Sequence, residues 1–359
     1  MKNKINKIVP ALLIISVFLS SCNSSKEKSN TTEVQKTVYA NDVIPFFNHW
    51  NLVLGDGSNA GIAEDFEQKD FFYTQTDDTG NWVVFKAPNA GDTHGTSNNC
   101  RTELAQLKKW TAQTPAKLSA TLKVMNVSTT GDARVAASYA TVVGQIHSAD
   151  GHENEPLKIF YKKFPGHTKG SVFWHYEINT AGDDNSGRWD YSSAVWGHDF
   201  AVVGTGEDKY PDEPKEGIAL GEEFSYKIEV SEGIMELTFE SEGHETKTFT
   251  KNLVNSEYTT AADIPQQTQE LFVPIGQDGV ERAEAYTGEG LFFKLGSYNQ
   301  TNGKSPDVNK NWCSGAETHG GDIQKQYEDG NYAEVWFREA SIVVSDDAIS
   351  NKGYFDKND

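Results

Sequence analysis

Short strand-like runs, each ended by turn-forming residues, fill the sequence from about residue 41 to residue 347. Alternating apolar and polar side chains are typical of strands with one buried face, and clusters of Gly, Asp, Asn or Pro end the runs. No long amphipathic helix is evident, and only 259–270 has the pattern of a short one. The sequence therefore predicts an all-β antiparallel sandwich or jelly roll, with strands at 82–86, 118–127, 135–147, 157–164, 171–178, 224–230, 234–239, 291–300 and 332–344.

One connection between strands has a specific signal. The tripeptide Ser231-Glu232-Gly233 separates two runs of alternating hydrophobic residues, and its glycine can adopt a positive φ angle. We therefore predict a β-hairpin here. No internal repeat or second linker is evident, so one domain is expected at 41–347, followed by a polar tail at 348–359.

The N-terminal segment has the layout of an export signal. Three lysines precede an apolar run at 8–19, which is too short for a comfortable membrane span of about 20 residues. The run ends in Leu19-Ser20-Ser21-Cys22, which resembles the lipobox of bacterial lipoproteins. This predicts a signal peptide at 1–21, lipidation of Cys22 and a flexible tether at 22–40 that anchors an exported domain to a membrane, the outer membrane in a Gram-negative cell. The alternative is an ordinary signal peptide with a chance cysteine.

The charge of the chain excludes one class of partner. There are 52 Asp and Glu against 32 Lys and Arg, a formal net charge of -20. Removal of the signal peptide would also remove three lysines and make the exported chain more acidic. Because neutralising phosphates needs a surplus of cations, we expect no non-specific nucleic-acid binding.

Two cysteines remain after Cys22. Cys100 and Cys313 are far apart in the sequence, and an exported domain meets an oxidising compartment. We therefore predict a disulfide between them, with two separate buried thiols as the alternative.

Three short segments combine anion-binding with proton-transfer side chains: RTEL at 101–104, QIH at 145–147 and FFKLGSYNQ at 292–300. On extended strands, residues two apart share a face. Three polar sets follow from this rule: Arg101 with Glu103, Gln145 with His147, and Lys294 with Tyr298 and Gln300. If the strands are neighbours, one surface carries an anion-binding set in which two proton-transfer groups are embedded.

These three segments, in this order, resemble those of the alginate lyases of polysaccharide lyase family 7. Family members show Arg-Thr/Ser-Glu-Leu, then Gln-Ile/Val-His, then Tyr-Phe-Lys-x-Gly-x-Tyr-x-Gln. The resemblance implies a β-jelly roll whose concave sheet binds alginate, with no cofactor required and a monomeric enzyme. It implies catalytic roles for Arg101, Gln145, His147 and Tyr298, and substrate binding by Glu103, Lys294 and Gln300.

The sequence departs from the family pattern at a few positions. Ala105 stands where many relatives have a second Arg, Phe292 replaces the usual Tyr, and Leu295 replaces a smaller residue. Segments 182–217 and 301–330 lie outside the resemblance and are expected to be loop elaborations. Together with 150–156, they are long enough to close one end of a groove, which suggests exolytic action or a preference for short oligomers.

The implied reaction explains why these side chains are needed. Elimination from a 4-linked uronate removes the C5 proton beside a carboxylate, so Arg101 and Gln145 would first bind that carboxylate. His147 and Tyr298 are the candidate base and acid. For mannuronate, Tyr298 alone could play both parts, whereas guluronate presents the proton and the leaving oxygen on opposite faces and needs both groups. Ile146 in the second motif is associated with guluronate-containing stretches in the family.

Other interpretations compete with this one. A glycoside hydrolase would need two carboxylates facing the scissile bond, and no such strand motif is evident. A non-catalytic glycan-binding lipoprotein could use the same fold, with Trp189 and Trp196 as contacts. Taken singly, Arg101 is more simply a surface ion pair, held by Glu103, and His147 and Tyr298 are structural. The acidic clusters at 56–59 and 183–185 do not match a dedicated calcium loop and are expected to be solvated turns, so no metal site is predicted.

Overall fold

The computed structural model describes residues 37–45, 47–91, 97–149, 155–178, 189–254 and 290–344. From Val38 onward these residues belong to one compact unit. The predicted signal peptide with Cys22, most of the tether, the helix at 259–270 and the polar tail lie outside the described residues. Within the described ranges, no helix has the length and apolar character needed to cross a membrane.

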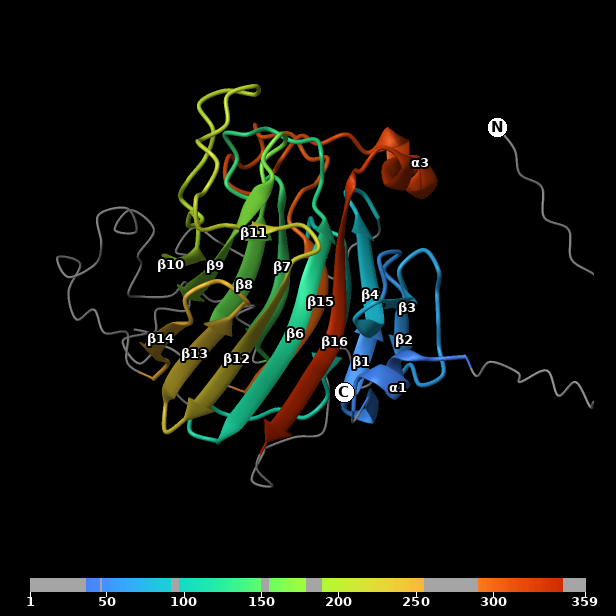
Figure 1. Cartoon of the computed structure of the whole chain (residues 1–359), viewed down its shortest axis with the longest axis vertical. Helices are drawn as coiled ribbons and strands as arrows, with labels where there is room; N and C mark the ends of the chain where they lie inside the picture. Colours follow the sequence, from blue (N-terminus) through green and yellow to red (C-terminus); the bar gives the residue numbers. More distant parts are fainter. Residues whose placement is uncertain are drawn as a thin grey trace, which may run out of the picture. The chain divides into compact units, whose positions relative to one another are not determined.

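Nine of the described strands form the sheet that carries the three motifs (Figure 1). Their order is β10-β9-β8-β7-β15-β5-β1-β2, with β11 paired to β9. All the pairings are antiparallel. The strands are β1 Trp50–Val53, β2 Asn59–Gly61, β5 Arg101–Gln106, β7 Ala140–Ser148, β8 Leu157–Lys162, β9 Lys169–Ile178, β10 Trp189–Trp196, β11 Ile218–Ala219 and β15 Leu291–Asn299.

A second antiparallel sheet packs against the first. It has the order β14-β13-β12-β6-β16-β4-β3 among the described strands. These strands are β3 Phe72–Asp77, β4 Gly80–Pro88, β6 Ala116–Asn126, β12 Glu223–Ser231, β13 Ile234–Glu240, β14 Lys247–Asn252 and β16 Tyr332–Val344. The predicted all-β, two-sheet antiparallel architecture is confirmed.

The core lies between the two sheets. One sheet contributes Leu104, Ile146 and Phe293, the other contributes Leu122 and Phe337, and all belong to one buried cluster. Because side chains alternate along a strand, the polar neighbours of these core residues on the motif strands point to the opposite face. We call that outer face of the nine-stranded sheet the site face.

Helical structure is confined to short segments among the described residues: α1 Ala40–Val43, the 3-10 turns η1 Phe47–His49 and η4 His319–Gly321, and α3 Ile323–Glu328. The carboxylate of Asp322 caps α3 by accepting the backbone N–H of Lys325. Segment 301–330 was expected to be a loop, so η4 and α3 correct that expectation in part.

The strand predictions from alternation are accurate where turn residues bound the run. The hairpin at 231–233 is confirmed: Ser231 pairs with Ile234 across a two-residue turn, in which Glu232 and Gly233 have φ angles of 52° and 80°. The run 135–147 becomes a strand only at Ala140, since the residues before it form turns. Segment 182–217 was expected to be only a loop, but it contains β10, which extends the nine-stranded sheet beyond β9.

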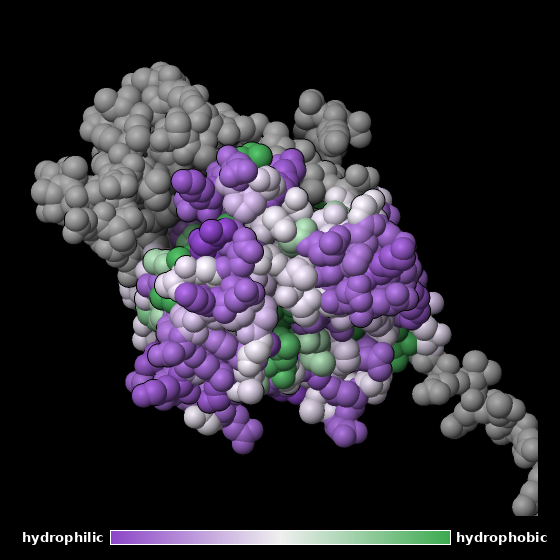
Figure 2. Space-filling view, turned by 90° about the horizontal axis from the view of Figure 1, so that it is seen from above, coloured by the Kyte–Doolittle hydropathy of each residue, from purple (hydrophilic) through white to green (hydrophobic). Residues whose placement is uncertain are grey.

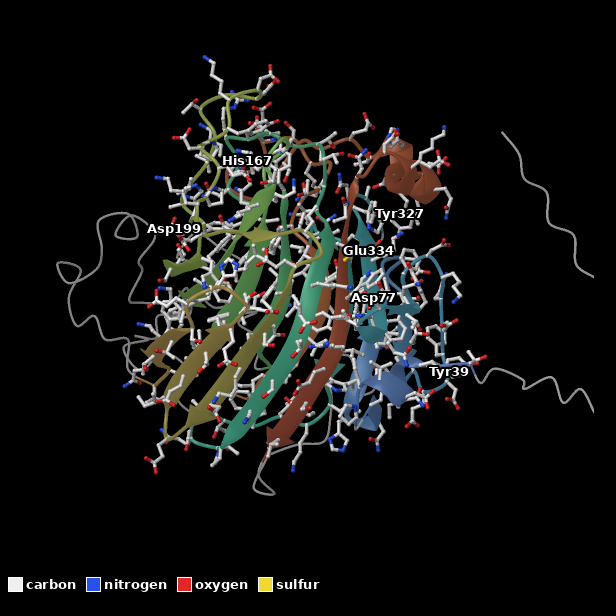
Figure 3. The ribbon with its side chains drawn as sticks, in the orientation of Figure 1. Tyr39, Asp77, His167, Asp199, Tyr327 and Glu334 are labelled. Carbon is white, nitrogen blue, oxygen red and sulfur yellow. The ribbon has the colours of Figure 1, made fainter. Side chains whose placement is uncertain are left out.

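The outer face of the second sheet is polar and its cations are paired. Asp77 and Glu334 lie on this side, with Tyr327 near them (Figure 3). Lys123 pairs with Asp77, and Lys86 pairs with Glu334 and lies over the Tyr327 ring. Seen from above, the described surface is mostly hydrophilic with small separate apolar patches (Figure 2).

Candidate active site

The three sequence motifs lie on adjacent strands. β15 is placed between β7 and β5, and the pairing aligns Lys294 with Gln145 on one side and Ala105 on the other. Two rows of paired residues then cross the site face. The first, which we call the charged row, is Ala105, Lys294, Gln145, Lys158, His175 and Ser192. The second, the aromatic row, is Arg101, Tyr298, Val142, Phe160, Phe173 and Ala194.

Glu103 is the buried centre of the motif residues. Its carboxylate lies 2.7 Å from Lys294 Nζ and 3.5 Å from Arg101 Nη1, and it accepts a hydrogen bond from Gln145 Nε2. Burial alone would raise the pKa of Glu103, but the charges of Lys294 and Arg101, with the hydrogen bonds from Lys294 and Gln145, lower it below its ordinary value. Glu103 is therefore an anion that fixes three neighbouring side chains. With 1% of its surface exposed, Glu103 is placed to orient these three side chains.

Lys294 has the environment of a cation that loses its proton easily. Its exposed fraction is 1%, and burial lowers its pKa to about 8, against the opposing influence of Glu103. At neutral pH most molecules therefore carry a positive charge next to Gln145. Above about pH 8 that charge is lost.

Arg101 and Tyr298 form a cation–π pair. The guanidinium carbon of Arg101 lies 3.8 Å from the centroid of the Tyr298 ring, and Lys294 Nζ lies 5.9 Å from the same centroid. The Tyr298 hydroxyl also shares a hydrogen bond of 3.0 Å with Ser97 Oγ. Two cations, Arg101 and Lys294, and the Ser97 hydroxyl thus surround the phenol.

His147 is held as a neutral imidazole with one defined tautomer. Its Nδ1 lies 2.6 Å from the carbonyl oxygen of Ser148, which can only accept, so Nδ1 carries the proton and Nε2 has the lone pair. Burial, followed by the charge of Lys294, lowers the pKa of His147 to about 3. The ring also stacks on Phe292 at a centroid distance of 5.2 Å. His147 is therefore in the basic form throughout the neutral range.

Gln145 and Gln300 have different surroundings. Gln145 is fully buried, and its Oε1 has no hydrogen-bond partner among the described residues. Gln300, predicted to bind substrate, is 2% exposed and donates from Nε2 to the backbone carbonyl of Tyr298. The structure thus brings Arg101, Gln145, His147 and Tyr298 together, while Gln300 supports the backbone behind Tyr298.

Similarity to known proteins shows to which family the chain belongs. A family model described as alginate lyase matches residues 44–343, which is most of the chain. The chain belongs to the alginate lyases of polysaccharide lyase family 7. An alginate lyase of Klebsiella pneumoniae is 27% identical over 300 residues, covering 72% of this chain and 83% of the relative.

Solved structures agree with this assignment. The exolytic family 7 alginate lyase AlyA5 of Zobellia galactanivorans is 59% identical, superposes with a TM-score of 0.80, and is matched over 87% of this chain and 99% of its own. The Klebsiella pneumoniae enzyme superposes with a TM-score of 0.56 at 21% identity, over 84% of this chain and 96% of that one, a likeness that shows the fold alone. The predicted β-jelly roll is confirmed.

Two glycines of this lyase allow the motif strands to approach their neighbours. Gly296 has a φ angle of 147°, and a Cβ there would lie 2.4 Å from the Thr102 carbonyl oxygen. A Cβ at Gly144 would lie 2.4 Å from the Tyr226 hydroxyl, which donates to the carbonyl of Val143. Both glycines lie where the register between the strands shifts. Larger residues would displace the strands that present Lys294, Tyr298 and Gln145.

An aromatic pair covers the site face beside the motif strands, and sequence reasoning did not find it. Phe200 follows β10, next to Asp199, which lies beside that strand (Figure 3). The centroid of the Phe200 ring lies 5.5 Å from that of Phe160 and 5.4 Å from that of His175. Trp312, from the 301–330 segment, stacks on Phe200 at 5.1 Å. We call these two residues the Phe200–Trp312 wall. The unusual length of the two segments was its one signal in the sequence.

Two predictions need correction. Cys100 and Cys313 are buried thiols rather than halves of a disulfide; the Cys100 thiol donates to the Gly55 carbonyl, and burial raises the pKa of Cys313. The side-chain amide of Asn302 instead links the residues that precede the two cysteines. Its Nδ2 donates to both Asn99 Oδ1 and the Trp312 carbonyl. Trp196 packs in the core and cannot contact a glycan as suggested for a binding protein.

The acidic cluster at 56–59 has the expected form of a turn. Ser58 donates to the Asp56 carboxylate from its backbone N–H and from its hydroxyl. The cluster at 183–185 lies outside the described residues. Within the part of the chain that the structure describes, no group of three His, Cys, Asp or Glu side chains is placed to hold a metal ion.

Proposed function

We propose that this lyase cleaves 4-linked uronates of alginate by β-elimination on the site face. The placement of Arg101, Gln145, His147 and Tyr298 on three adjacent strands of one face, with Arg101 and Gln145 held by the buried Glu103, carries this proposal. Arg101 and Gln145 bind the carboxylate of the uronate that reacts. Hydrogen bonds and positive charge stabilise the extra negative charge that this carboxylate gains as the C5 proton leaves.

The proton transfers are divided between His147 and Tyr298. His147 Nε2 accepts the C5 proton, the electrons of the C5–H bond form the C4=C5 double bond, and the C4–O4 bond breaks. Tyr298 then donates its hydroxyl proton to the departing O4. The products are a new reducing end and an unsaturated uronate at the new non-reducing end. Each proton transfer of this kind contributes about 10²- to 10⁴-fold to the rate.

A preference for guluronate-containing stretches follows from having two separate proton-transfer groups. The neutral tautomer of His147 supplies a base distinct from Tyr298, as removal of a proton on the face opposite the leaving oxygen requires. Ile146 is buried in the core, so its influence on this choice would come through the placement of Gln145 and His147. Guluronate-rich blocks are therefore the proposed better substrate.

Exolytic action is the proposed mode of cleavage. The Phe200–Trp312 wall packs on the rows at β8 and β9, next to the catalytic strand β7. Adjacent strands are about 4.8 Å apart, so roughly 5 to 10 Å of the site face lies between Gln145 and the wall. That length suits the end of a chain and not a continuing polymer. The exolytic action of the 59% identical relative supports the same mode.

The remaining proposals concern the state of the enzyme in the cell. We propose that the enzyme is a monomer. We also propose that it needs no cofactor, because Arg101 and Lys294 already supply positive charge at the site. Activity should then survive treatment with a chelator.

The N-terminal sequence supports export and lipid anchoring through Cys22. Radioactive or mass-tagged fatty-acid labelling of wild type and Cys22→Ser would test this anchoring. The lyase function itself is tested by the ultraviolet absorbance of unsaturated uronate released from alginate.

A further inference from the structure

A buried ionic triad lies beside the base and has no part in the chemistry described above. Lys158 Nζ is 2.9 Å from Glu177 Oε2 and 3.2 Å from Glu155 Oε2. Lys158 and Glu177 are 5% and 1% exposed. Burying charges such as those of Lys158 and Glu177 is costly unless they are paired, so an arrangement of this kind on the site face calls for a functional explanation.

The triad occupies the stretch between the catalytic residues and the wall. Lys158 follows Gln145 in the charged row, and His175 follows Lys158. Lys158 Nζ lies 5.9 Å from the centroid of the Trp312 ring, and His175 stacks on Phe200. A uronate adjoining the one held by Gln145 would therefore rest over Lys158, about one strand spacing or 4.8 Å farther along the face.

Glu155 differs from Glu177 in its contacts. The Glu155 carboxylate contacts two side chains at once: Oε2 lies 3.2 Å from Lys158 Nζ, and Oε1 lies 3.7 Å from His147 Nε2. Its side chain is 12% exposed and it precedes β8, whereas the Glu177 side chain is 1% exposed within β9. In the ligand-free protein, a carboxylate thus lies between the base and Lys158, where substrate must enter.

We propose that Lys158 binds the carboxylate of the uronate next to the one that loses its proton, and that this carboxylate replaces Glu155. Exchange of one carboxylate for another leaves Lys158 paired throughout, so no buried charge is left without a partner during binding. Glu177 stays in place and fixes the lysine. Departure of Glu155 also clears Nε2 of His147 for the C5 proton. This inference rests on the proposed lyase function.

Two substitutions should change binding in opposite directions. Binding of a purified guluronate trimer is measured by calorimetry in a Tyr298→Phe background, in which turnover is expected to be about 10²-fold slower or more. Lys158→Met should weaken binding about tenfold or more, as expected for loss of a charge-assisted hydrogen bond. Glu155→Gln should tighten binding several-fold, because the competing carboxylate is gone. Lys162→Met is the matched control: Lys162 is a buried lysine on the same strand that donates to the Ala136 carbonyl, and its loss should leave binding unchanged.

The double variant separates competition at Lys158 from a general reduction of negative charge. The gain from Glu155→Gln should disappear when Lys158→Met is also present, because the two residues act on one contact. Weaker binding by Glu155→Gln, an equal gain in both backgrounds, or unchanged binding by Lys158→Met would overturn the proposal. If Lys158→Met does not fold, the sign of the Glu155→Gln effect decides. Absence of lyase activity in the wild type would instead refute the proposed function.

Discussion

The guanidinium of Arg101 lies over the ring of Tyr298, with 3.8 Å between its carbon and the ring centroid. The two residues are also direct partners in the pairing of β5 with β15. Arg101 is therefore placed both to bind a substrate carboxylate and to hold the ring of the phenol that exchanges protons.

Replacing the Tyr298 hydroxyl tests its role in proton transfer. Tyr298→Phe keeps the ring under Arg101 and removes only the group that would protonate O4. We expect kcat to fall about 10²-fold or more, while binding of oligomers measured by calorimetry stays within a few-fold of wild type. Residual activity above about a tenth of wild type would argue against Tyr298 as the proton donor.

The pH dependence of kcat/KM should respond to Lys294. Its charge is the strongest charge effect lowering the pKa of His147 to about 3, so Lys294→Met should move the acid limb to higher pH. Because the pKa of Lys294 itself is about 8, wild-type kcat/KM should decline as pH rises through 8, when the cation is lost. That decline should be absent in Lys294→Met.

The control for this profile is Lys227→Met on the outer face of the other sheet, which should leave both limbs in place. If the acid limb has the same midpoint in wild type and Lys294→Met, Lys294 does not set the protonation of His147.

Glu103 should matter for stability as well as activity. Glu103→Gln would leave Arg101 and Lys294 as two buried cations without their shared anion, a change expected to cost about 3 to 5 kcal/mol of unfolding free energy. Denaturant unfolding of Glu103→Gln and of the exposed control Glu236→Gln would measure it.

The lowered pKa of Glu103 also predicts how the free energy of unfolding changes with pH. Its stabilisation is present above the unfolded pKa of about 4.3 and is lost as pH falls through the lower folded pKa. This component should be missing in Glu103→Gln. Equal unfolding free energies for Glu103→Gln and wild type at pH 7 would contradict the central position assigned to Glu103.

The wall should determine the sizes of the products. Phe200→Ala together with Trp312→Ala would open the site face beyond β8, so early products should include medium-sized oligomers, whereas wild type should accumulate the smallest products at once. Product sizing by chromatography over time would show this. Medium-sized oligomers among the earliest wild-type products would refute exolytic action.

The sequence predicted most strands, one hairpin and the motif faces because these depend on local rules. Side-chain alternation placed Gln145 with His147, and the hairpin at 231–233 followed from one glycine. The buried role of Glu103 was open in the sequence, because nothing local shows that Lys294 and Gln145 converge on it from two other strands. Burial of a carboxylate is a property of the assembled sheet.

Other features depended on long-range packing. The wall unites Phe200 and Trp312 from segments more than a hundred residues apart, and the sequence indicated only that both segments were long. The disulfide prediction failed for a related reason. Two cysteines in an exported chain suggest a bond, but geometry decides, and here Asn302 joins the two chain segments beside the cysteines through hydrogen bonds.

Release of unsaturated uronate from alginate tests the central claim most directly. Wild-type protein incubated with guluronate-rich alginate should produce a steady rise in ultraviolet absorbance from the new C4=C5 bond, and His147→Ala should abolish it. Activity should be higher on guluronate-rich than on mannuronate-rich blocks. A wild-type protein that binds alginate, yet gives no rise in absorbance on any block-enriched fraction, would contradict the assignment of Arg101, Gln145, His147 and Tyr298 as a catalytic set.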